Sequence, residues 1–479
     1  MRPRQRPSSR GKIAARPKAA RDVAFAVLSE YKNSGRFVSQ LLDRTLARTP
    51  DFSPDERRLA VELINGVVRR QATLDALLTP HVARPRHRIE GELWTLLQLG
   101  AYQLVFLDAI PHYAAVSETV ALAKQVGRKG WDGFVNGVLR AVQRLLTDQF
   151  TAQPAADALP IADGRYRRLT RGLFRDPSAD PVAYVADAFS FPRWLIERWN
   201  SRFDLSEMCR IGFWFDEPAP LALRVNQLKA ERDIVLEMLA AHGVHAVPGG
   251  LSESIRMDGT RRVDSLPGFA EGLFSVQDES AMQAVDLLAP RGGETVLDLC
   301  AAPGSKTTHI AERMRNTGTV IATDTHSDRL HRVEENCLRL GISIVHPLLV
   351  SPSSDNVPPG PFDAVLVDVP CSNTGVLGKR PEARWRIDEA QIEELTGQQQ
   401  ALLLAACQRL KPGGRAVYST CSIEPEENEQ IVRQVLGART ELTLVCERYH
   451  VPGRPADGGY QALLQRGDSP SPQPSDGPI

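Results

Sequence analysis

Two cysteines stand where strand-like runs of the sequence end, and a serine follows each of them. Cys371 comes after "FDAVLVDVP" and Cys421 comes after "RAVYST". A single cysteine is usually an inert core residue, but these two lie between proline or threonine and serine rather than among aliphatic residues. We therefore interpret Cys371 and Cys421 as candidate reactive thiols, with Asp368 as a carboxyl group close to the first of them.

A thiolate beside a carboxyl group can carry out covalent catalysis on a pyrimidine. Addition of the thiolate to carbon 6 makes carbon 5 nucleophilic enough to attack an electrophilic methyl group. A base then removes the carbon 5 proton so that the thiol can leave. A carboxyl group that faces N3 and the exocyclic amine stabilises the charge that develops, and Asp368, three residues before Cys371, is placed for that role.

Cys421 lies just ahead of a predicted helix in "TCSIEPEENE". The first turn of this helix is expected to contain Pro425, Glu426 and Glu427. Unpaired amide donors and the positive end of the helix would then lie near the sulfur and favour the thiolate. The glutamates would oppose this effect, but acids in a first turn usually point to solvent, where their charge is screened.

A second set of residues predicts a nucleoside-containing cofactor. In "VLDLCAAPGSKTTHI" a strand ends near Asp298, a turn of small residues follows, and a helix begins near Ser305. Asp324 ends the next strand, 20 residues after Gly304. In doubly wound sheets such a turn lets a ligand approach, and an acid at the second strand end accepts the ribose hydroxyls. The turn is neither a phosphate loop, which needs glycine before Lys306, nor a dinucleotide fingerprint, which needs more glycines.

Alternating elements are expected to bring these residues together. Beyond about Gln277, the runs "ETVLDLCA", "GTVIATD", "FDAVLVDVP" and "RAVYST" alternate with helical segments. This alternation predicts a parallel, doubly wound α/β sheet. Because the carboxyl ends of parallel strands lie at one edge, the thiols and the strand-end acids should converge there.

Upstream segments predict separate domains. Residues 21–148 repeat apolar residues at helical spacing and predict an all-α domain, in which Ser53, Pro54 and Glu56 mark a helix start. Residues 149–189 lack clear periodicity and predict a linker with room for one short helix. The remaining predictions are a small α+β subdomain at 190–275, a Rossmann-like domain at 276–466 and a disordered tail at 467–479.

The composition is ordinary for a soluble multi-domain protein. The chain has 479 residues, of which 42% are apolar, and its 58 basic residues balance its 58 acidic residues. Residues 1–20 are basic without any acid and predict a disordered arm. No apolar run is suited to a signal peptide or a membrane span, so we expect a cytoplasmic protein. The 7 cysteines include no CxxC pair, which argues against a disulfide framework and against a metal site.

Several segments resemble the signature sequences of the Sun (Fmu) family of RNA cytosine-C5 methyltransferases, namely "LDLCAAPGSKT", "LVDVPCSNTG", "PEARW" and "YSTCSIEPEENE". "LRVN" and "VQDESA" are similar to the family's amino-terminal subdomain. "IPHYAAVSETVALAK" and "FVNGVLR" are similar to the NusB-like RNA-binding domain of its bacterial members. The resemblance spans residues 21–466. It implies a multi-domain fold, with an all-α NusB-like domain followed by a small α+β subdomain and an α/β Rossmann-like S-adenosylmethionine-dependent methyltransferase domain.

The resemblance also implies roles for individual residues. The thiol of Cys421 would be the nucleophile that attacks cytosine carbon 6, and the thiol of Cys371 would assist release of the product. Lys306 would help to organise the active site with Asp368. S-adenosylmethionine would bind residues of the turn and of the neighbouring strand ends, which are Cys300, Ala301, Ala302, Pro303, Gly304, Ser305, Lys306, Asp324, Arg329 and Asp368.

The chain departs from the family pattern in several places. Ser305 stands where glycine is usual, which a helix start tolerates because serine caps well, and Val369 replaces a usual alanine. The acid expected near the end of the third strand is missing. Val350 and Ser351 stand about there, and Asp355 lies further on in a proline-rich loop. The contact to the adenine amine of the cofactor therefore has no obvious residue.

RNA contacts are predicted for the basic arm, for "RHR" at 86–88 and for Trp385 in "GKRPEARWRI". Basic side chains there would meet phosphates, and the indole ring would stack on a base. Solvated surface charge explains such clusters equally well.

The leading hypothesis is methylation of cytosine carbon 5 in 16S ribosomal RNA, with S-adenosylmethionine as cofactor and without a metal, a membrane or an obligate protein partner. The same chemistry on transfer RNA or another RNA is an alternative, because the motifs do not encode the target. A catalytically weak RNA-binding assembly factor is a second alternative, against which the intact Cys371, Cys421 and Asp368 argue. A redox enzyme is the most remote, since no CxxC motif is present.

Overall fold

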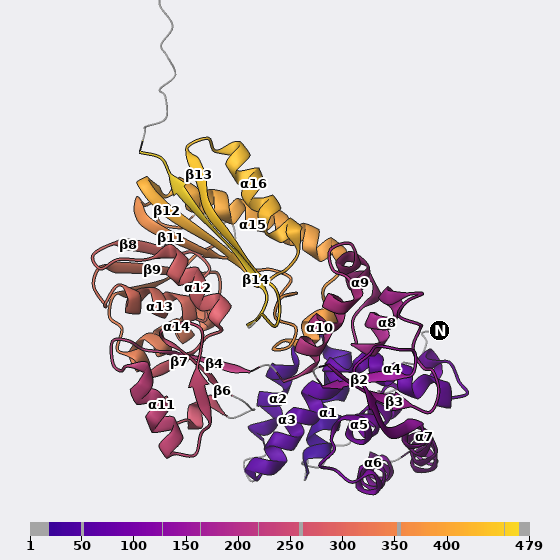
Figure 1. Ribbon diagram of the computed structural model, residues 1–479. Helices are drawn as coiled ribbons and strands as arrows, with labels where there is room; N and C mark the ends of the chain where they lie inside the picture. Colours follow the sequence, from indigo (N-terminus) through magenta and orange to yellow (C-terminus); the bar gives the residue numbers. More distant parts are fainter. Residues whose placement is uncertain are drawn as a thin grey trace, which may run out of the picture. The chain divides into compact units, whose positions relative to one another are not determined.

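The computed structural model describes residues 19–48, 52–126, 128–162, 164–218, 220–257, 262–351, 356–454 and 456–468. The chain forms two compact units, Met1–Asp216 and Glu217–Ile479 (Figure 1). Nearly all of the predicted basic arm, the tail beyond residue 468 and Asp355 lie outside the described residues. The predictions made for those segments therefore stay predictions.

The first unit begins with helices, as the spacing of apolar residues predicts. They are α1 (Ala20–Ser34), α2 (Val38–Leu46), α3 (Pro54–Arg69), α4 (Gln71–Leu78), α5 (Gly91–Phe106), α6 (His112–Val126) and α7 (Trp131–Leu145), with short 3-10 helices at Thr79–His81 and Arg86–Arg88. The predicted helix start is confirmed, because the Ser53 side chain accepts a hydrogen bond from the Glu56 backbone N–H. Helix α5 is buried along most of its length and contacts α1, α3, α4, α6 and α7.

The segment 149–189 is largely folded, so the prediction of a linker is wrong. Strands β1 (Leu146–Thr151), β2 (Ala158–Ala162) and β3 (Arg165–Leu169) form an antiparallel sheet, and α8 (Pro181–Ala188) follows. Strands β1 and β3 are rich in polar residues, and β2 is only 5 residues long with a proline inside it, so no regular apolar pattern marks the sheet. Tertiary contacts stabilise them instead, since the Tyr166 ring packs edge-on against Phe189 and Phe213.

The small subdomain predicted at 190–275 is divided between the two units. Helices α9 (Arg193–Asn200) and α10 (Leu205–Asp216) end the first unit. In the second unit an antiparallel sheet of order β5-β6-β4-β7 packs with α11 (Arg232–Ala241) around one apolar cluster. Its strands are β4 (Leu221–Val225), β5 (Ala246–Pro248), β6 (Ser254–Met257) and β7 (Phe274–Val276), with a 3-10 helix at Val263–Ser265.

A larger sheet in the second unit has the predicted Rossmann-like topology. Its order is β10-β9-β8-β11-β12-β14-β13, and the strands from β10 to β12 in this order are parallel. They are β8 (Thr295–Asp298), β9 (Thr319–Asp324), β10 (Val345–Leu349), β11 (Phe362–Asp368) and β12 (Leu410–Thr420). The antiparallel hairpin of β13 (Leu442–His450) and β14 (Gly459–Arg466) extends the sheet and is not expected from the alternation of strands and helices.

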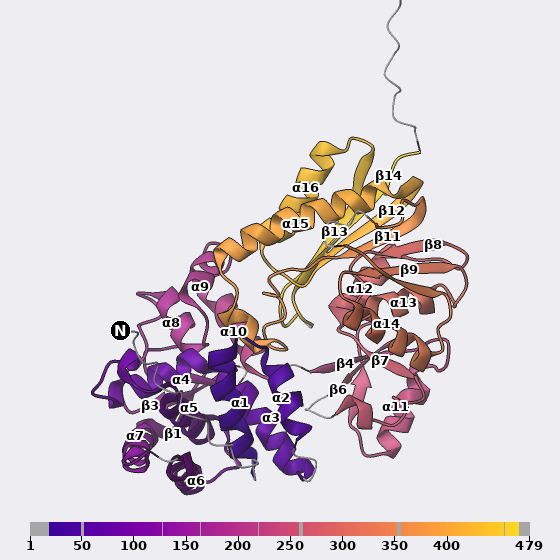
Figure 2. The same ribbon diagram turned by 180° about the vertical axis from the view of Figure 1, so that it is seen from behind.

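Helices cover both faces of this sheet (Figure 1 and Figure 2). α12 (Glu279–Leu288), α13 (Ser305–Arg313) and α14 (Ser327–Leu340) share one apolar cluster with Val296 and Leu366. α15 (Glu389–Gln408) and α16 (Glu429–Ala438) share another with Leu297 and Val365. Successive strand residues point to opposite faces, so covering both faces explains why the strands read as nearly continuous apolar runs. In the part of the chain that the structure describes, no helix has the length and apolar character that crossing a membrane requires.

Candidate active site

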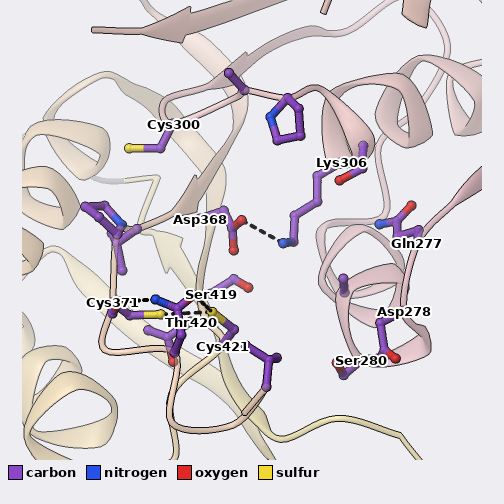
Figure 3. A pocket seen from close by; sticks show the side chains of 18 of the residues that line it. Gln277, Asp278, Ser280, Cys300, Lys306, Asp368, Cys371, Ser419, Thr420 and Cys421 are labelled. Carbon is purple, nitrogen blue, oxygen red and sulfur yellow. Dashed lines mark hydrogen bonds and ion pairs between the residues drawn. The ribbon is translucent and has the colours of Figure 1, made fainter. Parts of the chain in front are cut away.

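A pocket of about 590 Å³ lies at the carboxyl ends of β8, β9, β11 and β12 (Figure 3). All of its lining residues belong to the second unit. Among the candidate residues of the sequence, those that line it are Cys300, Ala302, Pro303, Ser305, Lys306, Asp324, Arg329, Asp368, Cys371 and Cys421. Ala301 and Gly304 lie in the turn but are not among the lining residues.

Ala301 and Gly304 shape the turn between β8 and α13. The Ala301 N–H donates to the Thr323 carbonyl oxygen of β9 at 2.9 Å, and the Gly304 N–H donates to the Ala301 carbonyl oxygen at 2.8 Å. Gly304 has a φ of 98°, which favours glycine, and a Cβ there would lie 3.2 Å from Val333 Cα in α14. These contacts bring the start of α13 against the end of β9, where the cofactor acid was predicted.

Asp324 is held at the end of β9 with its carboxylate almost fully buried. One carboxylate oxygen accepts the His326 backbone N–H at 3.1 Å, and the other lies 3.4 Å from the Arg329 guanidinium. Arg329 also donates to the Ala302 carbonyl oxygen at 2.7 Å. Arg329 therefore links the acid of the second strand to the small-residue turn, and both border the same part of the pocket.

Lys306 and Asp368 form an ion pair inside the pocket, with 2.7 Å between Nζ and Oδ2. Burial alone would lower the pKa of Lys306, but the Asp368 carboxylate, which also accepts its hydrogen bond, outweighs burial and raises that pKa. Lys306 therefore stays protonated at neutral pH and acts as a donor rather than as a base. In Figure 3 this pair lies above Cys371 and Cys421.

The two candidate thiols lie side by side, with 3.0 Å between their sulfur atoms. The hydrogen bond between them raises the pKa of Cys371 well above its usual range, and burial and the charge of Glu427 add to this. The same hydrogen bond lowers the pKa of Cys421. Burial and the charge of Asp368 oppose this shift, whereas Arg380 and Lys306 favour the anion. Of the two thiols, Cys421 therefore ionises more readily, and its thiolate would accept a hydrogen bond from the Cys371 thiol.

Asn373 fixes the loop that carries Cys371. Its side-chain amide nitrogen donates to the Cys371 carbonyl oxygen at 2.7 Å, and its amide oxygen lies 3.3 Å from the Cys421 sulfur. Asn373 has a φ of 62°, a left-handed conformation that asparagine tolerates better than most residues. Arg380 donates to the same amide oxygen at 2.7 Å, which places a cation next to Cys421.

Glu427 is fully buried behind both cysteine loops, so the prediction that it points to solvent is wrong. It lies in a 3-10 helix, Pro425–Glu427, and α16 begins only at Glu429. The Glu427 carboxylate accepts hydrogen bonds from the Ser372 backbone N–H and from the hydroxyls of Ser372 and Ser422. Gln399 of α15 donates to it at 2.9 Å. This set of donors compensates for burial of the charge and ties the loop after β11 to the loop after β12.

Comparison with known proteins identifies the family of the chain. Residues 285–464 match the family model described as 16S rRNA methyltransferase RsmB/F. Residues 18–144 match the NusB family, and residues 191–264 match the ferredoxin-like domain of RsmF/B-like methyltransferases. The chain is 37% identical over 422 residues to the probable ribosomal RNA small subunit methyltransferase B of Synechocystis sp., with 87% of this chain and 89% of that protein covered. The chain belongs to the 16S ribosomal RNA methyltransferase B family.

Further relatives agree with membership of this family. The probable ribosomal RNA small subunit methyltransferase B of Bacillus subtilis is 33% identical over 424 residues, which are 86% of this chain and 87% of that protein. The crystal structure of PH0851 superposes with a TM-score of 0.73 and 25% identity, covering 93% of this chain and 98% of that one. The resemblance to the Sun family and the multi-domain fold predicted from it are thereby confirmed.

Two further ionisable groups at the end of β8, Asp298 and Cys300, have raised pKa values. Burial raises the pKa of Asp298 to about 7, opposed by a hydrogen bond from the Thr307 hydroxyl. Burial also raises the pKa of Cys300, and the charges of nearby carboxylates, Asp298 and Asp368 first, act in the same direction. Cys300 therefore remains a thiol at neutral pH, and its pKa shifts in the opposite direction to that of Cys421, although both line the pocket.

The third strand offers no acid to this pocket among the described residues. Val350, directly after β10, lines the pocket, and its N–H donates to the Asp324 carbonyl oxygen at 3.0 Å. Neither Trp385, in the 3-10 helix Pro381–Trp385, nor residues 86–88 line the pocket. The Arg86 guanidinium lies 4.6 Å from the centre of the Trp94 ring, within the first unit.

Several polar residues around the thiols are not expected from the sequence. Glu427 and Asn373 hold the cysteine loops, and Arg380 supplies a cation. Lys379 also lines the pocket and forms ion pairs with Asp278 at 2.6 Å and with Asp457 at 2.8 Å. The partners of Glu427 and Lys379 come from separate segments of the chain, so no local pattern in the sequence marks these residues.

One other cluster in the second unit has residue types that bind metals, namely Glu253, Asp286 and His309. The Arg313 guanidinium lies 4.0 Å from Glu253 and 3.3 Å from Asp286. Burial lowers the pKa of His309 to about 3, so its ring is neutral. A guanidinium between the carboxylates supplies the positive charge that a metal would bring, and we interpret the cluster as an ion-pair network.

Proposed function

We propose that the protein transfers a methyl group from S-adenosylmethionine to carbon 5 of a cytosine in 16S ribosomal RNA, with Cys421 as the nucleophile. The observation that carries this proposal is the pair of sulfur atoms 3.0 Å apart, with pKa values shifted in opposite directions, beside the Lys306–Asp368 ion pair. Family membership supports ribosomal RNA as the substrate, since the curated relatives are named as small subunit methyltransferases.

The lowered pKa of Cys421 makes it the attacking sulfur in this mechanism. Its bond to carbon 6 pushes the electron pair of the 5,6 double bond towards carbon 5 and the N3 side of the ring. The ion pair of protonated Lys306 and Asp368 offers a donor and an acceptor to that side. Bound S-adenosylmethionine supplies the electrophilic methyl group that carbon 5 attacks.

Cys371 serves the second half of the reaction in this mechanism. Loss of the carbon 5 proton to a base restores the double bond and expels the Cys421 sulfur as a thiolate. Cys371 holds its proton because its pKa is raised, and its sulfur lies 3.0 Å from the departing one. Its hydrogen bond therefore stabilises the leaving thiolate, which agrees with a role in product release.

The cofactor end of the pocket fits S-adenosylmethionine. Asp324 offers a carboxylate for the ribose hydroxyls, and the turn of small residues at 300–305 leaves room beside it. Val350 presents an apolar side chain where the family pattern has an acid. The adenine ring would therefore gain packing from Val350 but no hydrogen bond from its side chain.

Methyl transfer to defined RNAs tests the proposal. The protein is incubated with methyl-labelled S-adenosylmethionine and either unmodified 16S RNA or unmodified transfer RNA, and the labelled base is mapped. We expect 5-methylcytosine in 16S RNA. Label in transfer RNA alone would establish the same chemistry on another substrate, whereas RNA binding without label in either would favour an assembly factor.

A further inference from the structure

Gln277 is a buried polar residue of the pocket wall that the mechanism above does not use. It lies between β7 and α12, and its backbone N–H donates to the Ala222 carbonyl oxygen of β4 at 3.1 Å. Only 4% of the residue is exposed, yet it lines the pocket. Both its backbone and its side chain are therefore fixed relative to the catalytic residues.

Arg224 of β4 determines which way the Gln277 amide faces. The Arg224 side chain is fully buried and forms a two-point ion pair with Glu312, with distances of 3.0 Å and 2.7 Å. Its remaining N–H groups donate to the Thr308 hydroxyl at 3.0 Å, to the Ser305 carbonyl oxygen at 2.7 Å and to the Gln277 amide oxygen. A guanidinium has only donors, so the amide of Gln277 must turn its oxygen towards Arg224.

The amide nitrogen of Gln277 is consequently directed away from Arg224. Figure 3 shows it turned towards the pocket, on the side where Lys306 lies. This nitrogen is buried and has no hydrogen-bond partner within the residues that the structure describes. Buried donors without an acceptor are rare because they destabilise a fold, so this one points to an oxygen or nitrogen of a ligand.

The chemistry of the target base shows which acceptor this donor would meet. In the proposed function Cys421 bonds to carbon 6, and Asp368 faces N3 and the exocyclic amine. The acceptor left on a cytosine is then the O2 carbonyl oxygen, next to N3 and away from the amine. Lys306 contacts Asp368 and lies between Asp368 and Gln277 in Figure 3. If Asp368 faces N3, Gln277 therefore lies on the side of the base that carries O2.

We propose that the Gln277 amide nitrogen donates a hydrogen bond to O2 of the target cytosine, held in register by Arg224. This inference rests on the proposed function and adds a base-binding residue to it. Because Arg224 also binds the Ser305 carbonyl oxygen at the start of α13, one guanidinium positions both the wall that contacts the base and the turn predicted to hold the cofactor.

Gln277→Glu and Gln277→Ala test the contact. Glutamate keeps the acceptor for Arg224 and replaces the donor by an acceptor that repels O2. We expect kcat/KM for RNA to fall by about 10- to 100-fold in both variants, while the Kd for S-adenosylmethionine changes less than about threefold. Gln434→Glu places the same charge at an exposed position of α16, outside the residues that line the pocket, and is the matched control, expected to retain the wild-type rate.

A second substrate separates a base contact from a merely structural role. RNA that carries 2-thiocytidine at the mapped position has sulfur in place of O2, which is a weaker acceptor. The wild-type protein should methylate it about tenfold more slowly than the cytidine RNA, and Gln277→Ala should lose that preference. An unchanged preference in Gln277→Ala, or a Kd for S-adenosylmethionine weakened as much as kcat/KM, would overturn the inference alone. A wild-type protein that forms no 5-methylcytosine would overturn the proposed function and this contact with it.

Discussion

The loop after β11 and the loop after β12 each carry a cysteine followed by a serine, but the pKa values of the two cysteines shift in opposite directions. Cys371 and Ser372 follow one strand, and Cys421 and Ser422 follow the next. Both serines donate to the single carboxylate of Glu427, and the sulfur atoms touch. Nevertheless the pKa of Cys371 is raised and that of Cys421 is lowered.

The difference between the loops comes from what surrounds each sulfur rather than from the residue itself. The Cys371 thiol donates the shared hydrogen bond, and burial and the negative charge of Glu427 also raise its pKa. Cys421 accepts that hydrogen bond and has the cations of Arg380 and Lys306 close by. Two chemically identical groups can thus take different roles, one as the nucleophile and the other as the proton-bearing neighbour.

Replacing each thiol in turn tests this division of roles most strongly. We expect Cys421→Ala to lower the methylation rate by on the order of 10³-fold or more, because no sulfur remains that can attack carbon 6. Cys371→Ala should instead accumulate a covalent protein–RNA adduct, visible as a slowly migrating band on a denaturing gel. An adduct in Cys421→Ala would mean that the roles are reversed.

Removing the negative charge of Glu427, which both loops contact, should change the position of both cysteine loops. Glu427→Gln replaces an acceptor oxygen by a donor where the Ser372 and Ser422 hydroxyls, the Ser372 N–H and Gln399 now converge. The loops should separate, with a loss of about 10- to 100-fold in kcat and of about 1 to 3 kcal/mol in the free energy of unfolding. Steady-state kinetics and urea denaturation measure the two effects. Glu394→Gln, at an exposed position of α15, is the control and should change neither.

The convergence of these loops could be predicted from the sequence, whereas their asymmetry could not. Parallel strands with apolar runs on both faces place their carboxyl ends at one edge, so Cys371, Cys421 and Asp368 had to meet. The burial of Glu427 depends on donors from three separate segments, and no local pattern records that. First-turn acids usually face solvent, and here tertiary hydrogen bonds override that tendency.

Outside the pocket, too, local contacts can be predicted from the sequence, whereas contacts between distant segments cannot. Ser53 and Glu56 mark a helix start because the cap is a local contact. The sheet of β1, β2 and β3 escaped prediction because aromatic contacts from residues 20 or more positions away along the chain stabilise it. The link from Arg224 to Gln277 and Ser305 spans about 50 and 80 positions, and only the folded chain shows it.

The hydrogen bond between the sulfur atoms should be measurable by itself. Cys371→Ser keeps an O–H donor for the Cys421 thiolate, whereas Cys371→Ala removes the donor. The pKa of Cys421 should therefore be higher in the alanine variant than in the serine variant. If the two pKa values differ by about one unit, iodoacetamide at pH 7 should alkylate Cys421 about tenfold more slowly in the alanine variant. Equal pH profiles for the two variants would show that Arg380 and Lys306 alone lower the pKa.

The pKa of Asp298, at the end of β8, is also raised by burial, and no second thiol is involved in this shift. Burial raises the pKa of Asp298 to about 7, above its ordinary value of 3.8, so the folded state holds a proton that the unfolded state releases. Its contribution to the free energy of unfolding is fully present below about pH 4 and is lost as the pH rises through about 7. Asp298→Asn stays neutral throughout and keeps an acceptor for the Thr307 hydroxyl.

Relative to this variant, the wild-type protein should lose about 2 to 3 kcal/mol of unfolding free energy between pH 5 and pH 8, measured by urea denaturation at each pH. Asp363 is the control, because despite some burial its hydrogen bonds with Lys411 and the Thr295 N–H lower its pKa, so Asp363→Asn should show no such trend in this range. A difference between wild type and Asp298→Asn that is independent of pH would mean that Asp298 is ionised in the fold. The negative charge of an ionised Asp298 would then raise the pKa of the nearby Lys306 further and keep that side chain a donor over a wider pH range.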